Sequence, residues 1–155
     1  MERFDDTFAK TVVTRFGELA EDATPQWGTM SKAHVIGHLE KVLCYTLGQG
    51  PEMPFRGNFM TRNVFRHLVL FGLREIPHNI RVPRPEGVTK EQFFPSATIE
   101  ELATTIDTYL AAIPTGTLAT RIHPFFGPLN TRAWQRFHRL HFIHHMKQFD
   151  LGEGF

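Results

Sequence analysis

Hydrophobic residues recur at three- and four-residue intervals in four stretches of the chain, and this spacing is typical of amphipathic helices. The four stretches cover residues 5–20, 31–47, 98–113 and 131–149. Helix-capping residues precede three of them: Ser31, Thr98 with Glu101, and Asn130. Between 114 and 129, prolines and glycines predict a rigid turn that leads into the last helix.

Residues 49–95 interrupt the helical pattern and form a long crossover. Only the stretch from Thr61 to about Leu73 looks helical there, because prolines break the remainder: Pro51, Pro54, Pro77, Pro83, Pro85 and Pro95. A connection of this length lets the second and third long helices lie parallel. We therefore expect an all-α fold, a four-helix bundle with up-down-down-up topology and a long Pro/Arg-rich crossover between helices two and three.

The crossover is rich in arginine and has few acidic residues. Six arginines alternate with four phenylalanines: Arg56, Arg62, Arg66, Arg74, Arg81 and Arg84, with Phe55, Phe59, Phe65 and Phe71. One interpretation is a basic lining over a pocket. The other is a solvated arginine face whose stems cover apolar rings.

Composition limits the classes of partner. A chain of 155 residues suits one domain, residues 1–155, and its formal net charge of +1 indicates neither a nucleic-acid nor a membrane partner. The acidic N-terminus is no signal peptide, and no apolar run approaches the roughly 20 residues of a membrane-spanning helix. We expect a soluble cytoplasmic protein. The single cysteine, Cys44, lies about 120° from His38 around its helix, so a thiol nucleophile is a weak alternative.

The last helix carries histidines on the face that should be buried. With about 100° per residue, six side chains lie within about 60° of His141: Trp134, Phe137, His138, His144, His145 and Gln148. His141 and His145, four residues apart, can converge on one divalent ion such as Zn(II) or Ni(II). A third ligand must come from a neighbouring helix, and the other histidine on a strongly periodic helix face is His38, with His34 its near neighbour. Three protein ligands leave one position open, as in catalytic sites.

Other residues surround these three candidate ligands. Those that we expect to orient the ligands or to line a pocket are His34, His138, His144, Gln148, Tyr45 and Trp134. The competing interpretation is that the histidines are hydrogen-bonded core residues, since a polar group in a core needs a partner but not a metal. No phosphate loop or nucleophile elbow is found in the sequence, and no catalytic residue is assigned.

Three segments together resemble the DinB-like (YfiT-like) superfamily of metal-binding four-helix bundles, and a branch of it with unknown function. They are Trp27-Gly28-Thr29-Met30 leading to His38-Leu39, then His123-Pro124-Phe125-Phe126-Gly127-Pro128-Leu129, and finally Trp134 through His141, His144-His145 and Gln148-Phe149. The resemblance implies a divalent ion on one histidine of helix two and two of helix four, at positions matching His38, His141 and His145, and often a homodimer.

The resemblance also suggests a class of reaction. Members of the superfamily include transferases and isomerases that use a low-molecular-weight thiol, which makes a metal-dependent thiol transferase or hydrolase the first hypothesis. It would act through a metal-bound water or thiolate on a small molecule beneath the crossover. This chain departs from the superfamily where Met146-Lys147-Gln148 replaces the usual Arg-Gly-Gln. The alternative hypothesis is a non-catalytic, stress-related bundle for metal binding or dimerisation.

Overall fold

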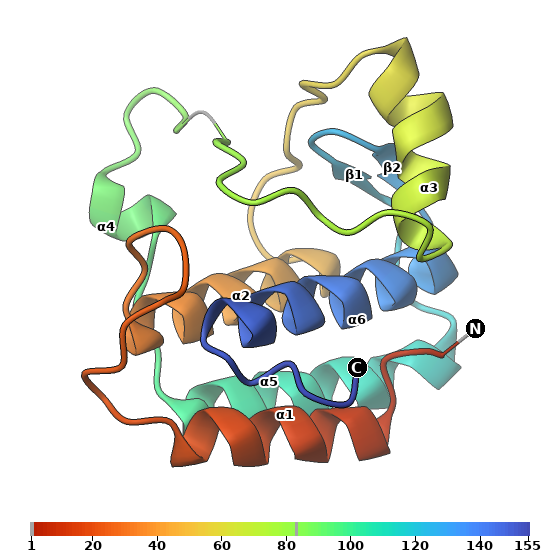
Figure 1. Cartoon of the computed structure of the whole chain (residues 1–155). Coiled ribbons are helices and arrows are strands. Elements are labelled where there is room, and N and C mark those ends of the chain that lie inside the picture. The colour runs from red at the N-terminus through yellow and green to blue at the C-terminus, as the bar shows by residue number, and fades with distance from the viewer. Residues whose placement is uncertain (1, 83) are drawn as a thin grey trace.

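The computed structural model describes residues 2–82 and 84–155, so Met1 and Pro83 lie outside the described residues. It is mostly helical, with one small two-stranded sheet. The four long helices are α1 (Asp6–Glu18), α2 (Lys32–Thr46), α5 (Ile99–Ala112) and α6 (Thr131–Gln148). Figure 1 shows them in two layers, with α2 beside α6 and α1 beside α5.

Local capping sets where these helices begin. The side chains of Asp5, Ser31 and Asn130 accept hydrogen bonds from backbone amides of the first turn of α1, α2 and α6, respectively. Thr98 and Glu101 form a complete capping box at the start of α5. Each bond satisfies an amide that has no partner within its helix. The predicted positions of the four long helices are thereby confirmed to within one or two residues.

Two apolar clusters hold the layers together. The larger one lies between the long helices and includes Phe16, Leu39, Leu43, Leu102, Ile106, Phe142 and Met146. The smaller one joins α6 to the crossover and the sheet through Val69, Leu70, Phe126, Leu129, Trp134 and Phe137. Helix α6 therefore packs against the larger cluster on one side and against the crossover and the sheet on the other.

The predicted turn before α6 is a β-hairpin, so an all-α description is incomplete. Strand β1 (Arg121–His123) pairs antiparallel with β2 (Gly127–Leu129). Nδ1 of His123 accepts bonds from the amides of Phe125 (3.2 Å) and Phe126 (3.1 Å) and so closes the turn. Burial lowers the pKa of His123 to about 3, which keeps this nitrogen available as an acceptor.

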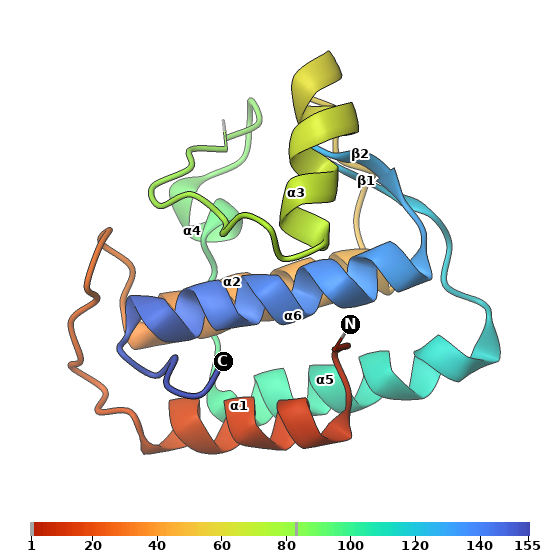
Figure 2. The same cartoon turned by 45° about the vertical axis from the view of Figure 1, so that its right-hand side comes forward.

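The crossover passes above the layer formed by α2 and α6 (Figures 1 and 2). The helix expected over residues 61–73 is shorter, a π-helical segment η1 (Thr61–Phe65) continued by α3 (Arg66–Leu70). A short helix that the sequence pattern did not predict, α4 (Lys90–Phe93), precedes the return to α5, and a 3₁₀ turn, η2 (Ile113–Thr115), follows it.

The end of the crossover lies directly against α2. A methyl group at Gly37 would lie 2.1 Å from the carbonyl oxygen of Pro95, so only glycine permits this approach. The amide of Ala97 donates to the carbonyl of Ala33 (3.1 Å). Among the helices of the described residues, none is both long and apolar enough to cross a membrane.

Candidate metal centre

Three histidine side chains from two helices, α2 and α6, converge on one point. Nε2 of His141 lies 2.9 Å from Nε2 of His38 and 3.1 Å from Nε2 of His145. Helix α2 supplies the first ligand candidate and α6 the other two, which stack because they are four residues apart. Within residues 2–82 and 84–155, no other histidine, cysteine or carboxylate joins this cluster.

Burial keeps the three rings neutral. His141 and His145 are each 7% exposed, and His38 is half-buried. Removal from water lowers the pKa of His38 to about 4 and the pKa values of His141 and His145 well below the ordinary 6.5. The proximity of the histidines to one another, and of Lys41 to His38, acts in the same direction because each would repel a second positive charge. Near neutral pH each ring therefore has one nitrogen lone pair, which is the form that binds metal.

Gln148 determines which nitrogen of His145 carries that lone pair. Its Nε2 donates to the carbonyl of Trp27 (2.9 Å), so its Oε1 is the atom that faces Nδ1 of His145 at 2.7 Å. An amide oxygen only accepts, hence Nδ1 of His145 must be the protonated nitrogen. In the neutral ring, Nε2 then carries a lone pair that is directed at His141.

This arrangement fits a metal ion better than a set of hydrogen bonds. Nε2 of His141 has at most one hydrogen, yet it has two nitrogen neighbours. Its Nδ1 has no hydrogen-bond partner among the described residues. Nitrogens bound tetrahedrally at about 2.0–2.1 Å would lie about 3.3 Å apart, close to the two distances measured from Nε2 of His141. The ligand atoms of His38 and His145 lie within 4.8 Å of each other. A cation accepts all three lone pairs, whereas one proton satisfies a single pair of nitrogens.

Comparison with known proteins places the chain in a family. A family model described as "Protein of unknown function (DUF1569)" matches residues 3–151. The chain belongs to the DUF1569 family. No curated protein and no solved structure matches it. The matched range contains all three clustered histidines, so the candidate centre lies within the DUF1569 region of the chain.

His138 is separate from the cluster in this DUF1569 member. The hydroxyl of Thr46 donates to the carbonyl of Leu43 (2.8 Å), so Nε2 of His138 must donate to that hydroxyl at 3.0 Å. The ring is fully buried, and burial lowers its pKa to about 3. His138 therefore joins α6 to α2 as a neutral hydrogen-bond donor.

His144 faces the crossover next to the cluster. Its ring centre lies 5.0 Å from that of His145, 5.5 Å from Trp27 and 5.7 Å from His78. The rings of Trp27 and His78 stack at 3.6 Å and 5°, although position 78 carried no signal in the sequence. Burial lowers the pKa of His144 to about 4. Nearby, Lys147 and Glu75 form an ion pair (2.6 Å) that also joins α6 to the crossover.

The remaining candidates make contacts elsewhere. The hydroxyl of Tyr45 donates to the carbonyl of Ile122 (2.8 Å), and the indole of Trp134 donates to that of Arg121 (3.2 Å), so both side chains hold the β-hairpin. Nδ1 of His34 lies 2.8 Å from the hydroxyl of Ser31 at the start of α2.

The environment of the single cysteine, Cys44, argues against a thiol nucleophile. Burial raises the pKa of Cys44, so its thiol is not activated as a nucleophile.

Gly28 has a left-handed backbone (φ 73°) next to Trp27, and an added methyl group would lie 3.1 Å from Nε2 of Gln148. The Trp27-Gly28 pair was visible in the sequence, but its contact with Gln148 was not.

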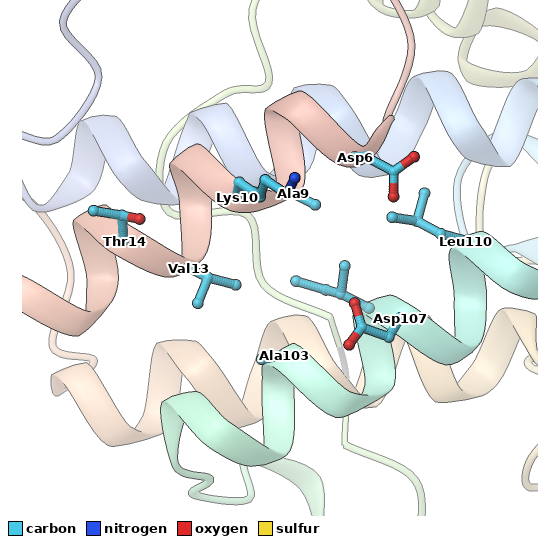
Figure 3. A pocket seen from close by; sticks show the side chains of 9 residues that line it. Asp6, Ala9, Lys10, Val13, Thr14, Ala103, Asp107 and Leu110 are labelled. Atoms are coloured by element: carbon cyan, nitrogen blue, oxygen red, sulfur yellow. The ribbon is translucent and has the colours of Figure 1, made fainter.

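A hollow of about 240 Å³ lies away from the histidines, between α1 and α5 (Figure 3). Apolar side chains, among them Val13 and Leu110, line it, and the carboxylates of Asp6 and Asp107 stand at its edge. None of the three clustered histidines lines this hollow. It therefore contributes nothing to the candidate centre.

Proposed function

We propose that this DUF1569 member binds one divalent transition metal ion, Zn(II) or Ni(II), through Nε2 of His38, His141 and His145. The observation that carries the proposal is the set of three neutral rings with adjacent Nε2 atoms, one of them fixed as a lone pair by Gln148. Imidazole is a common ligand of both ions.

We further propose that the centre serves a metal-dependent enzyme, a thiol transferase or a hydrolase, that acts on a small molecule. Support comes from the count of three protein ligands, because structural zinc sites usually have four and catalytic sites keep one position open. A divalent ion held here supplies Lewis-acid chemistry to a molecule in that position. The chain itself contributes neutral ligands and, through Gln148, a fixed ring orientation for His145.

We also propose that the chain is related to the DinB-like superfamily, as an up-down-down-up four-helix bundle. In Figures 1 and 2, α1 and α6 run in one direction while α2 and α5 run in the other. This order of directions supports an up-down-down-up bundle, in which the long crossover joins two parallel helices.

Metal analysis tests the site. Protein purified without chelator, then saturated with Zn(II) and desalted, is expected to retain one ion per chain. His141→Ala and His145→Ala should each lose it, whereas His67→Ala, an exposed histidine on α3, should retain it. Unchanged metal content in either ligand variant would show that the ion binds elsewhere.

A second experiment tests the open position and the thiol. Co(II) replaces zinc in many sites and has a visible spectrum that depends on its ligands. Adding a small thiol such as β-mercaptoethanol to the Co(II)-loaded protein should produce sulfur-to-cobalt charge-transfer absorption, since thiolate is a good ligand for such ions. A spectrum that the thiol leaves unchanged contradicts the thiol-dependent branch of the proposal.

A non-catalytic metal centre is the second candidate, and the low exposure of His141 and His145 favours it. A structural ion contributes its binding free energy to folding, so chelation would then unfold the protein. If the site serves catalysis, chelated protein should keep its helical circular dichroism and a cooperative thermal transition.

A further inference from the structure

The crossover contains an exposed segment, residues 53–74, that we call the crest. The helical part of the crest, η1 with α3, stands away from the four long helices, and its N-terminal end is the most distant part (Figures 1 and 2). At that end, Phe59 is 75% exposed and Met60 is 58% exposed. The crest is therefore a convex projection with large apolar side chains at its tip.

Exposed apolar side chains are concentrated in this segment. Of the ten large hydrophobic residues that are exposed within the described parts of the chain, six lie in the crest: Phe55, Phe59, Met60, Val64, Phe71 and Leu73. Met60 and Val64, four residues apart, lie within about one turn of each other near the tip, whereas Phe71 follows the C-terminal end of α3, where the guanidinium of Arg136 lies 5.3 Å from its ring centre. Such a concentration on a folded protein marks an interaction surface.

The crest is also strongly basic. It contains four arginines and no acidic residue, while residues 98–120, which include α5, contain three acidic residues and no lysine or arginine. The net charge of +1 is the balance of these regions, and for that reason it did not indicate an anionic partner. Arginine stems pack along apolar surface while the guanidinium stays at the polar boundary.

We propose that the crest is a docking surface for an anionic lipid membrane. Apolar side chains next to arginines match hydrocarbon beneath negatively charged headgroups. Single-stranded nucleic acid fits less well, because Met60, Val64 and Leu73 are aliphatic and cannot stack on bases. The proposal is independent of the metal centre.

Vesicle co-sedimentation of the full chain tests this inference. The protein should bind vesicles of equal parts phosphatidylcholine and phosphatidylglycerol, bind phosphatidylcholine alone much more weakly, and dissociate as salt is raised. The double variant Phe59→Ser/Met60→Ser should bind at least about tenfold more weakly. Its control is Phe155→Ser, which removes an exposed aromatic ring outside the crest and should bind like wild type.

Two single substitutions that each remove one positive charge test the contribution of the crest arginines to vesicle binding. Arg56→Gln should weaken vesicle binding about fivefold, whereas Lys10→Gln, an equal loss of charge on α1, should not. Circular dichroism confirms that each variant is folded.

Three results would overturn the proposal. The first is no vesicle binding, or equal binding to both compositions. The second is a dimer that Phe59→Ser/Met60→Ser converts to a monomer, because a second copy would then cover the crest. The third is binding of a single-stranded oligonucleotide in preference to the vesicles.

Discussion

Oε1 of Gln148 lies 2.7 Å from Nδ1 of His145, and this contact makes Nε2 of His145 the nitrogen that faces His38 and His141. The opposite end of the same amide donates to the carbonyl of Trp27. The loop before α2 thus orients a candidate metal ligand on α6 through one side chain. Outer contacts of this kind commonly set both the tautomer and the orientation of a ligating histidine.

Substitutions of Gln148 should separate its two bonds. Gln148→Leu removes the acceptor for His145, and we expect metal affinity to fall about 10- to 100-fold. Gln148→Glu retains an acceptor but repels the carbonyl of Trp27, so affinity should be retained while the melting temperature falls. Competition with a chromophoric chelator and thermal denaturation measure the two effects. An equal loss of affinity in both variants would show that Gln148 supports the fold only.

Gly28→Ala should weaken metal binding from outside the cluster. A left-handed backbone costs a non-glycine residue about 1–2 kcal/mol, and the new methyl group would press on Nε2 of Gln148. Gly72→Ala is the matched control, because Gly72 has the same backbone conformation (φ 72°) with nothing within 4 Å of the added methyl. Both variants should lose similar stability toward urea, but only Gly28→Ala should lose metal affinity. Unchanged affinity in Gly28→Ala would disconnect the loop from the centre.

Metal-free protein should lose stability as the pH falls below about 6.5. The pKa of His138 is about 3 in the folded state and near 6.5 when unfolded, so between these values only the unfolded chain binds the proton. The contribution of neutral His138 to the free energy of unfolding is present above pH 6.5 and decreases by about 1.4 kcal/mol per pH unit below it.

His138→Gln retains an amide donor for Thr46 and does not titrate, so it isolates this contribution. The free energy of unfolding, measured in urea at about pH 7.5 and about pH 5, should depend less steeply on pH in the variant. The difference in slope should correspond to roughly one fewer proton taken up on unfolding. Identical slopes in variant and wild type would mean that His138 binds its proton equally well in both states.

Gly37→Ala should destabilise the protein although alanine is the better helix former. The gain in helix propensity is about 1 kcal/mol, while the methyl group would lie 2.1 Å from the carbonyl oxygen of Pro95, and such overpacking costs about 1–3 kcal/mol or more. The control is Gly17→Ala in α1, where the nearest atom, on Ile99, is 4.0 Å away. We expect that variant to be equally or more stable in chemical denaturation. A stabilised Gly37→Ala would mean that residues 95–97 do not rest on α2.

Local signals in the sequence were sufficient for the long helices. Apolar spacing and capping residues such as Ser31, Thr98 and Asn130 act within one helical turn, so they can be read without knowledge of the fold. The hairpin at residues 121–129 was missed because it consists of two three-residue strands, too short for alternation to be recognised. The π-helical segment η1 within the crest likewise has no clear sequence signature.

For the candidate centre, the sequence alone determined the residue types and the pairing of His141 with His145, because i and i+4 neighbours follow from helix geometry. Only the tertiary structure decided that His38 meets them, that His138 bonds Thr46 instead, and that Tyr45 and Trp134 hold the hairpin. The same holds for the link from Trp27 through Gln148, since residues 121 positions apart in the chain meet only once the helices have packed. Periodicity specifies a helix face, but the neighbour of that face depends on contacts between segments distant in sequence.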